Sequence, residues 1–548
     1  MNSYLQIHPA DNVLVALQDL QAGTKITFNG HNIELLQLTP AKHKFLINDV
    51  KSGDPITMYG VLVAKAVTDI PQGGLMTTEN VVHDANAFHE KDGALQWQAP
   101  DVSKWKDRTF MGYHRQDGQV GTRNYWLVIP LVFCENRNVG VIKTAFEKGL
   151  GFAPAEVYNE QVTDLVALYK KGDLEAIKNY EAGQTTDSNK RSTVFPNIDG
   201  IKFLTHEGGC GGTRQDSDAL CALLAGYIHH PNVAGATVLS LGCQHAQVSI
   251  LQESLKKLNP NFNKPVLVYE QQKSASEFSM LSAAIKDTFL AMVEANRLTR
   301  QPAPLSRLVI GLECGGSDGF SGISANPAVG HTSDLLVALG GTSILSEFPE
   351  LCGVEQELIN RCISTDTSEK FIRIMRAYEN QAQSVGSGFY MNPSPGNIKD
   401  GLITDAIKSA GAAKKGGTSP VTDVLDYTEY VTKPGLNLLC TPGNDVESTS
   451  AEVGSGANIV LFTTGLGTPT GNPIAPVVKL ATNTKLATRM PDIIDIDTGS
   501  IISGQHTIEE MGEQILEYVI RAASGEVYTK AEQLHQDDFI PWKRGVSL

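Results

Sequence analysis

Four cysteines each stand at the end of an apolar segment that has the character of a buried strand. They are Cys134, Cys210, Cys243 and Cys314, and glycines stand beside the last three. Thiolate is a soft ligand that suits iron or zinc, and neighbouring glycines let the backbone approach an ion or a substrate closely. Because the carboxyl ends of strands line the ligand crevice of open α/β sheets, we expect the four cysteines to converge there as metal ligands. A role as small buried core residues is the alternative for each of them.

The spacing of these cysteines narrows the kind of metal site. Cys210, Cys243 and Cys314 are separated by 33 and 71 residues. A zinc ribbon is excluded, because its cysteine pairs are only about two to four residues apart. The other four cysteines lack strand-end glycines, and we expect them to be structural: Cys221, Cys352, Cys362 and Cys440.

Three basic or imidazole side chains suit the binding or conversion of an acidic substrate. Arg214 follows Cys210 in a glycine-rich stretch that opens an expected helix, where backbone N–H groups and the guanidinium are available to a carboxylate. A surface ion pair with Asp218 is the alternative role of Arg214. Near the amino terminus, His8 and His43 stand beside charged residues. Each suits acid–base chemistry, with a satisfied structural histidine as the alternative.

Two kinds of domain must position these residues. Residues 1–85 alternate short apolar runs with Gly and Pro turns, which predicts a small β-rich domain, and residues 86–108 lack a sustained period, which predicts a linker. Beyond them, apolar strands alternate with Gly-rich turns and amphipathic stretches, the pattern of Rossmann-like parallel-sheet α/β domains. We place the first in 109–300 and the second in 301–548. A polar insertion at about 155–195 is expected to be helical with a flexible tip and to carry no chemistry.

The composition limits the partners of the protein. Of its 548 residues, 41% are hydrophobic and 19% are charged, and the formal net charge is −15. This balance repels phosphate backbones and anionic lipids, so we expect neither nucleic acid nor a membrane as a partner, whereas a local basic or metal-containing pocket still suits a small acid. No apolar run reaches the ~18 residues of a membrane span, and the first residues lack a secretory signal, so we expect the cytoplasm. The sequence leaves a homo-oligomer open.

Motifs spread over nearly the whole chain resemble those of one enzyme family. They are Ile7-His8-Pro9-Ala10-Asp11-Asn12-Val13, His43-Lys44-Phe45, Gly112 to Asn124, Gly311 to Gly319, Asn392 to Asn397, Pro434-Gly435-Leu436-Asn437 and Pro442-Gly443-Asn444-Asp445. Residues 1 to about 82 resemble an SAF domain, and the remainder is similar to the UxaA-type hydro-lyases, the family that includes altronate dehydratase. The match is interrupted mainly by the 155–195 insertion.

The resemblance implies elimination of water from a sugar acid, with D-altronate giving 2-dehydro-3-deoxy-D-gluconate. Galactarate dehydratase and a sulfolactate sulfo-lyase share the architecture, so β-elimination from a 2-hydroxy acid is the common chemistry. The resemblance also implies dependence on ferrous iron, with manganese as an alternative metal, and an iron–sulfur cluster is not excluded. The expected partner is therefore a small-molecule sugar acid.

The expected mechanism begins with the carboxylate of the substrate. Iron chelates this carboxylate and the C2 hydroxyl, and Arg123 or Arg214 binds the carboxylate in a forked arrangement. Together with the family motifs, this predicts substrate contacts from Arg123, Asn124, Arg214, Ser317, Asp318, Asn397 and Asn444.

Proton transfer in this mechanism requires an acid and a base. We expect His8 and His43 to act if the small domain lies over the crevice as a lid, with Lys44 of the same His-Lys-Phe motif in the catalytic set. His206 is the rival base, because it stands at an expected strand end close to Cys210.

Other functions remain open from the sequence. A sugar-acid binding protein without chemistry is one alternative, but a pure binder has no need of oxygen-sensitive thiolates. An NAD-linked oxidoreductase is disfavoured, because the Gly-x-Gly-x-x-Gly turn is missing. Within the family, galactarate or another 2-hydroxy acid is the alternative substrate.

Overall fold

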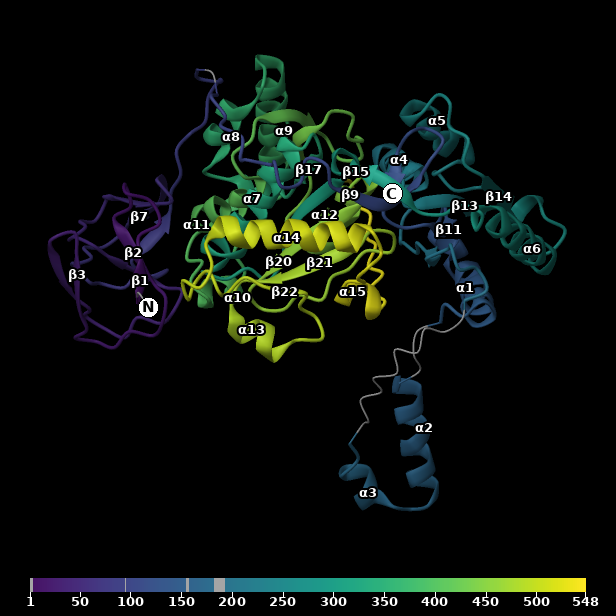
Figure 1. Cartoon of the computed structure of the whole chain (residues 1–548), viewed down its shortest axis with the longest axis horizontal. Helices are drawn as coiled ribbons and strands as arrows, with labels where there is room; N and C mark the ends of the chain where they lie inside the picture. The colour runs from purple at the N-terminus through teal and green to yellow at the C-terminus, as the bar shows by residue number, and fades with distance from the viewer. Residues whose placement is uncertain (1–2, 94, 154–156, 182–192) are drawn as a thin grey trace.

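Short antiparallel strands build the amino-terminal domain. The computed structural model describes residues 3–93, 95–153, 157–181 and 193–548. The first eight strands form a sheet β1-β2-β5, a hairpin β3-β4 and a sheet β6-β7-β8, at one end of the molecule in Figure 1. These strands are β1 (Tyr4–Leu5), β2 (Val13–Ala16), β3 (Lys25–Phe28), β4 (His31–Glu34), β5 (Lys44–Leu46), β6 (Pro55–Met58), β7 (Val61–Ala66) and β8 (Val81–His83). The predicted small β-rich domain is confirmed.

A small antiparallel sheet joins the two α/β domains. Residues 84–93 and 95–108 contain no helix or strand. The chain then forms β9 (Thr109–His114) and β10 (Val120–Gly121), and β9 also pairs with β15 (Gln301–Pro304). The strand β9 leads into the first α/β domain and β15 leads out of it. Their pairing therefore holds together the two segments that connect the α/β domains.

The first α/β domain contains a four-stranded parallel sheet. Its order is β12 (Gly200–Phe203), β11 (Tyr125–Pro130), β13 (Val233–Ser240) and β14 (Val266–Glu270). Every residue of β11 is buried, as expected for a central strand covered by helices on both faces. The covering helices are α1 (Asn136–Leu150), α4 (Arg214–His229), α5 (Val248–Leu258) and α6 (Glu277–Ala295).

The predicted polar insertion contains two helices. They are α2 (Val157–Lys170) and α3 (Leu174–Lys178), drawn apart from the sheets in Figure 1. Residues 182–192, where the flexible tip was expected, lie outside the described residues, as do residues 154–156.

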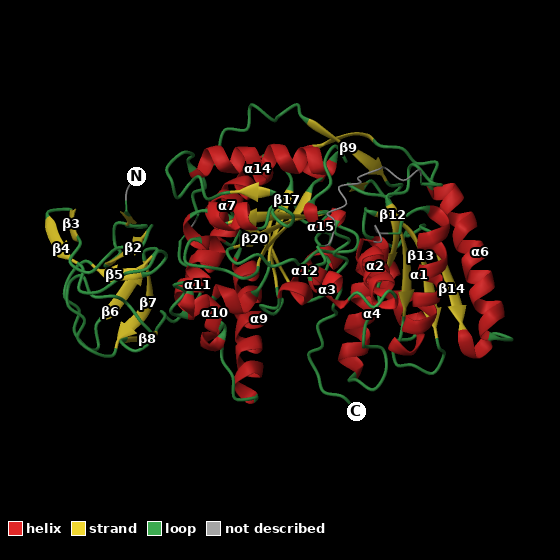
Figure 2. Cartoon of the chain, turned by 90° about the horizontal axis from the view of Figure 1, so that it is seen from below, coloured by secondary structure: helices red, strands yellow, loops and turns green. Residues whose placement is uncertain are grey.

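The second α/β domain contains a seven-stranded parallel sheet between layers of helices (Figure 2). In spatial order its strands are β18 (Val421–Leu425), β19 (Gly435–Leu439), β17 (Thr342–Leu345), β16 (Val309–Cys314), β20 (Ile459–Thr464), β21 (Val477–Ala481) and β22 (Ile496–Asp497). Its helices are α7 (Ala325–Ala338), α8 (Glu355–Arg361), α9 (Thr365–Ser384), α10 (Pro395–Lys399), α11 (Asp405–Ala412), α12 (Asp445–Gly454), α13 (Thr484–Arg489), α14 (Ile508–Ala523) and α15 (Lys530–Gln533). The predicted α/β class is confirmed.

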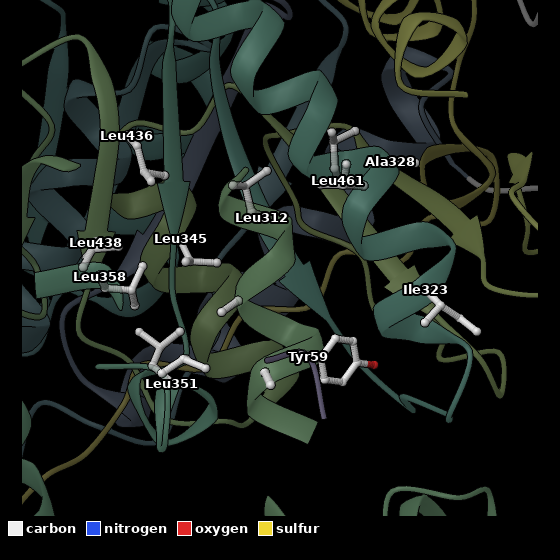
Figure 3. Packing of buried hydrophobic residues seen from close by; sticks show 14 of the residues in the cluster. Tyr59, Leu312, Ile323, Ala328, Leu345, Leu351, Leu358, Leu436, Leu438 and Leu461 are labelled. Atoms are coloured by element: carbon white, nitrogen blue, oxygen red, sulfur yellow. The ribbon is translucent and has the colours of Figure 1, made fainter. Parts of the chain in front are cut away.

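Alternate residues of this sheet face two different hydrophobic cores. Leu461 of β20 packs in the core that includes Ala328 of α7, whereas Phe462 packs in the core that includes α4 of the first domain. This alternation follows from the two-residue period of a strand. Tyr59 of the amino-terminal domain joins the same core as Leu312, so this domain also shares buried apolar surface with the second sheet (Figure 3).

Two lysines dock the amino-terminal domain on the second α/β domain. The Nζ atom of Lys42 lies 3.0 Å from Asp318 and 2.8 Å from Asp400. The fully buried Lys44 donates from Nζ to the carbonyl of Gly401 at 2.6 Å. Burial lowers the pKa of Lys44 to about 7, although Asp318 opposes the shift. The folded protein therefore holds Lys44 largely without charge above neutral pH.

Replacing Lys44 by Met should remove part of the pH dependence of stability. Between about pH 7 and the ordinary lysine pKa of 10.5, the unfolded chain binds more protons at Lys44 than the folded chain does. The free energy of unfolding must then rise with pH across this window, by on the order of 1 kcal/mol per pH unit at most. Urea unfolding of both proteins at pH 7, 8.5 and 10 measures the difference. Equal pH slopes would show that burial does not shift this lysine.

Candidate active site

Three loops meet at the carboxyl edge of the first sheet. The backbone N–H of Phe133 donates to Gly208 at 3.1 Å, and that of His245 donates to Gly209 at 2.9 Å. These bonds connect the loops that follow β11, β12 and β13, and the loops carry Cys134, Cys210 and Cys243. All three thiols are free and exposed. The structure therefore gathers three of the four predicted cysteine ligands at one edge.

Gly209 has no room for a side chain at the centre of these loops. Its φ is +95°, and a Cβ atom there would lie 2.1 Å from the carbonyl oxygen of Leu131. Only glycine combines this backbone conformation with so close an approach. The glycines around Cys210 thus serve the packing of the loops.

His206 orients the Cys210 loop. Its Nε2 donates to the carbonyl of Pro130 at 2.7 Å, and its Nδ1 accepts from the N–H of Gly208 at 3.1 Å. The carbonyl can only accept, so the proton resides on Nε2. Burial lowers the pKa of His206 to about 4, despite the opposing bond to Pro130. Because both ring nitrogens are occupied, His206 is a positioning residue and is not free to act as the predicted base.

A cavity of about 720 Å³ opens beside Cys210. Its lining includes His206 and Glu207 of the first domain and Glu447 and Trp542 of the second part of the chain. This volume is within the range of small-molecule sites. The cavity therefore lies between the two α/β domains, next to the cysteine loops.

Cys314 belongs to a different cluster, at the carboxyl edge of the second sheet. Its Sγ lies 3.4 Å from a carboxylate oxygen of Glu350 and 3.6 Å from one of Glu347. Lys415 pairs with Glu347 at 2.8 Å and Lys408 with Glu350 at 2.7 Å. Burial, reinforced by Glu347, raises the pKa of the Cys314 thiol well above its ordinary value. The expectation of one set of four cysteines is thus corrected, because the fourth follows a strand of another sheet.

Helix α12 links this cluster to the cavity. A carboxylate oxygen of Asp445 lies within 4.8 Å of oxygens of Glu313 and Glu347. Glu447, two residues along the same helix, lines the cavity. Successive helical residues rise by about 1.5 Å, so the two sites are neighbours. A Cβ atom at Gly315 would collide with Asp445, which explains the glycine after Cys314.

The acids of α12 have altered proton affinities. Burial, together with the charge of Glu347, raises the pKa of Asp445 to about 7. Burial also raises the pKa of Glu447. A carboxyl group with a raised pKa suits proton transfer near neutral pH. The prediction from the sequence missed both acids, although Asp445 ends the Pro442 to Asp445 motif.

Comparison with known proteins identifies the chemistry that this fold serves. Family models match residues 2–84 ("Altronate/galactarate dehydratase SAF domain"), 112–296 ("D-galactarate dehydratase/Altronate hydrolase, second domain") and 305–547 ("D-galactarate/Altronate dehydratase, C-terminal"). The altronate dehydratases of Bacillus subtilis and Escherichia coli are each 33% identical to this chain. Each match extends over 548 residues, which is 100% of this chain and 100% of the relative. The chain belongs to the altronate and galactarate dehydratase family. The galactarate dehydratase (L-threo-forming) of Escherichia coli is 31% identical over 538 residues, 97% of this chain and 94% of that protein.

Family membership confirms the predicted SAF domain and the predicted enzyme class. The protein is a hydro-lyase that acts on sugar acids. The alternatives of a binding protein without chemistry and of an NAD-linked oxidoreductase are thereby set aside.

Two residues predicted to bind substrate in this dehydratase lie at the wrong edge of the sheet. Arg123 and Asn124 precede β11, whereas Cys134 follows it, and the six residues of the strand span roughly 20 Å. The buried guanidinium of Arg123 bonds to Glu532 at 2.7 and 3.0 Å and to the carbonyl of Ala522 at 2.9 Å. Arg123 therefore connects the first domain to α14 and α15, and its guanidinium is fully buried inside the protein.

Three other residues predicted to bind substrate hold the second domain together. The side-chain amide of Asn397 donates to the carbonyl of Ser317 at 2.8 Å. The buried Asp318 accepts from Thr482 at 3.0 Å and pairs with Lys42 of the SAF domain. These contacts give the side chains of Asn397 and Asp318 structural partners, and Ser317 takes part through its carbonyl.

The remaining two residues of this set are exposed. Arg214 is the first residue of α4, and Asn444 immediately precedes α12. Among the described residues, Arg214 forms no ion pair with Asp218, so this alternative does not apply. Both side chains stand at helix starts near the cavity wall and stay candidates for substrate contact.

The SAF domain lies away from the cavity. Figures 1 and 2 both place it on one side of the second α/β domain, with the first α/β domain on the other. His8 is exposed there, His43 is half-buried, and Lys44 is buried against Gly401. The expectation that this domain covers the cysteine crevice as a lid is corrected, because it docks through Lys42 on the opposite side.

Proposed function

We propose that this dehydratase removes water from D-altronate in the cavity beside Cys210. The observation that carries the proposal is a cavity lined by Cys210 and Glu447, whose Cys210 loop is bonded to the loops of Cys134 and Cys243. Full-length similarity to two altronate dehydratases supports altronate as the substrate. Formation of a 2-keto acid from D-altronate, detected with semicarbazide, tests the reaction directly.

We propose that iron is the metal and that Cys134, Cys210 and Cys243 hold it. Their exposed thiols suit a soft ligand set, and Gln272 donates to the sulfur of Cys243 at 3.3 Å. Within the described chain, the three sulfurs do not all lie within 4.8 Å of one another. A single ion at about 2.3 Å from each sulfur requires sulfurs no more than about 4.6 Å apart. An iron–sulfur cluster, which three thiolates also suit, is therefore the other form of iron that we propose for them.

Manganese fits the cysteine loops poorly, because it prefers oxygen ligands. Glu313, Glu347 and Asp445, whose carboxylate oxygens lie within 4.8 Å of one another, form the set that would suit it better. Lys415 pairs with Glu347 at 2.8 Å, but one buried oxygen of Glu347 and one of Glu313 have no hydrogen-bond partner among the described residues.

Glu447 is our candidate for proton transfer. When bound, iron would polarise the carboxylate and the hydroxyl groups of the substrate as a Lewis acid. The proton leaves C2 for a carboxylate base, the C3 hydroxyl departs with a proton as water, and the resulting enol becomes the 2-keto-3-deoxy acid by protonation at C3. Because Glu447 lines the cavity and its pKa is raised, it suits the C2 step.

A cytoplasmic location is part of this proposal. All eight cysteines are free, and free thiols persist in a reducing compartment. No described helix is long and apolar enough to cross a membrane.

Serine substitutions separate the two cysteine clusters. Cys134→Ser, Cys210→Ser and Cys243→Ser should each lower iron content and turnover together, because serine is a harder and far less acidic ligand. The loss of turnover should exceed the roughly 10–100-fold typical of changes around a metal ligand. Cys314→Ser should leave iron content unchanged. Normal iron and turnover in the first three variants would refute the assignment.

Glu447→Gln should reduce kcat by roughly 10²–10⁴ while iron content and Tm stay at the wild-type values. The acid limb of the kcat/KM profile should also disappear, because an amide does not titrate. Glu509→Gln, at an exposed position of α14, is the matched control and should behave as the wild type. Undiminished kcat in Glu447→Gln would assign the proton transfer to another residue.

Substrate choice is measured by kcat/KM for D-altronate, galactarate and D-mannonate at equal iron loading. We expect a preference for D-altronate that reaches factors of ~10⁴ against an epimer, because a site built to bond each hydroxyl leaves buried partners unpaired when one is misplaced. A clear preference for galactarate would reassign the substrate within the family and leave the elimination chemistry intact.

A further inference from the structure

The carboxyl-terminal segment, residues 539–548, crosses from the second α/β domain to the cysteine loops of the first. The N–H of Trp542 donates to the hydroxyl of Tyr427 at 2.7 Å in the second domain. Further on, the N–H of Gly545 donates to Asp216 at 3.1 Å, and Ser547 forms an antiparallel bridge with Gly212, two residues after Cys210. Bonds at both ends hold this segment as a wall of the cavity.

Lys543, which belongs to this segment, is one of the residues that line the cavity. Among the described residues that line the cavity, it is the one lysine, and no arginine accompanies it. Its Nζ donates to the hydroxyl of Ser547 at 2.6 Å. Within the described structure, no carboxylate lies within ion-pair distance of Lys543. Its positive charge is therefore uncompensated, in a chain whose net charge is −15.

Three acidic residues line the cavity among those described, and one of them, Asp216, is already bonded to the carboxyl-terminal segment. Both carboxylate oxygens of Asp216 accept main-chain bonds from Arg544 and Gly545, so this acid is occupied by the segment itself. Glu207 and Glu447 also line the cavity. Among the described lining residues, Lys543 is thus the cation that can pair with one carboxylate, while Glu207 and Glu447 disfavour a second carboxylate through like-charge repulsion.

We propose that Lys543 contacts the carboxylate of the substrate and that the carboxyl-terminal segment selects sugar acids with one carboxylate over those with two. This inference rests on the proposed function for the assignment of the cavity. It gives Lys543 the role that was expected of Arg123 or Arg214; the guanidinium of Arg123 is buried and bonds inside the protein.

Lys543→Met tests the contact in the iron-loaded, full-length protein. The KM for D-altronate should rise at least tenfold, with kcat within a factor of about three and iron content unchanged, because only a binding interaction is removed. Lys543→Arg, which keeps the charge, should recover part of the affinity. Lys485→Met, at an exposed position of α13 outside the cavity, removes the same charge and should leave KM unchanged.

Galactarate distinguishes the possible placements of Lys543. If Lys543→Met impairs galactarate alone and leaves the KM for D-altronate unchanged, Lys543 faces the far end of the substrate and the inference is overturned. An unchanged KM for both acids also overturns it. Thermal unfolding of each variant confirms that the comparison is made on folded protein.

Calorimetric titration with D-altronate separates failure of this inference from failure of the proposed function. Turnover by the wild type together with unaltered binding by Lys543→Met refutes the inference alone. Binding without turnover by the wild type, lost in Lys543→Met, supports the contact while refuting the proposed reaction. Absence of both binding and turnover in the wild type refutes both.

Discussion

The main-chain bonds accepted by Gly208 and Gly209 hold the cysteine site together. Parallel strands place the ends of β11, β12 and β13 at the same edge of a sheet, but they do not by themselves bring the following loops into contact. The bonds from Phe133 and His245 do so, and they require that Gly209 approach the backbone of Leu131 without a side chain. Substituting Gly209 would therefore disturb all three cysteines at once. The glycine-rich sequence around Cys210 is a packing requirement before it is a chemical one.

Charge balance governs the neighbouring cluster in the second sheet. Burying several carboxylates is costly unless cations or hydrogen bonds compensate them. Lys415 and Lys408 provide that compensation for Glu347 and Glu350. Helix α12 places Asp445 beside this cluster and Glu447 in the lining of the cavity, so a single helical turn connects the buried cluster with the open site. This arrangement explains why an acid with raised proton affinity is found beside the cysteine loops.

The SAF domain and the carboxyl-terminal segment make contacts on opposite sides of the second α/β domain. At one side, Lys42 and Lys44 dock the SAF domain through Asp318, Asp400 and Gly401. At the other, the carboxyl-terminal segment bonds to Asp216 and Gly212 of the first domain. The second sheet is thus the common support, and the cavity forms where the first domain and the carboxyl-terminal segment meet on it.

The sequence by itself determined the local features of this protein. Periodicity and turn residues predicted the β-rich domain and the parallel-sheet α/β class, because strand alternation and glycine turns are properties of neighbouring residues. The strand-end positions of Cys134, Cys210 and Cys243, and the family motifs, were equally readable. Only the tertiary structure decided that Cys314 follows a strand of another sheet. It also decided that Arg123, which precedes β11, is paired with Glu532. Glu447 and Lys543 come to the cavity from segments more than 200 residues beyond Cys210, and such proximity depends on sheet order and domain packing, which no local pattern encodes.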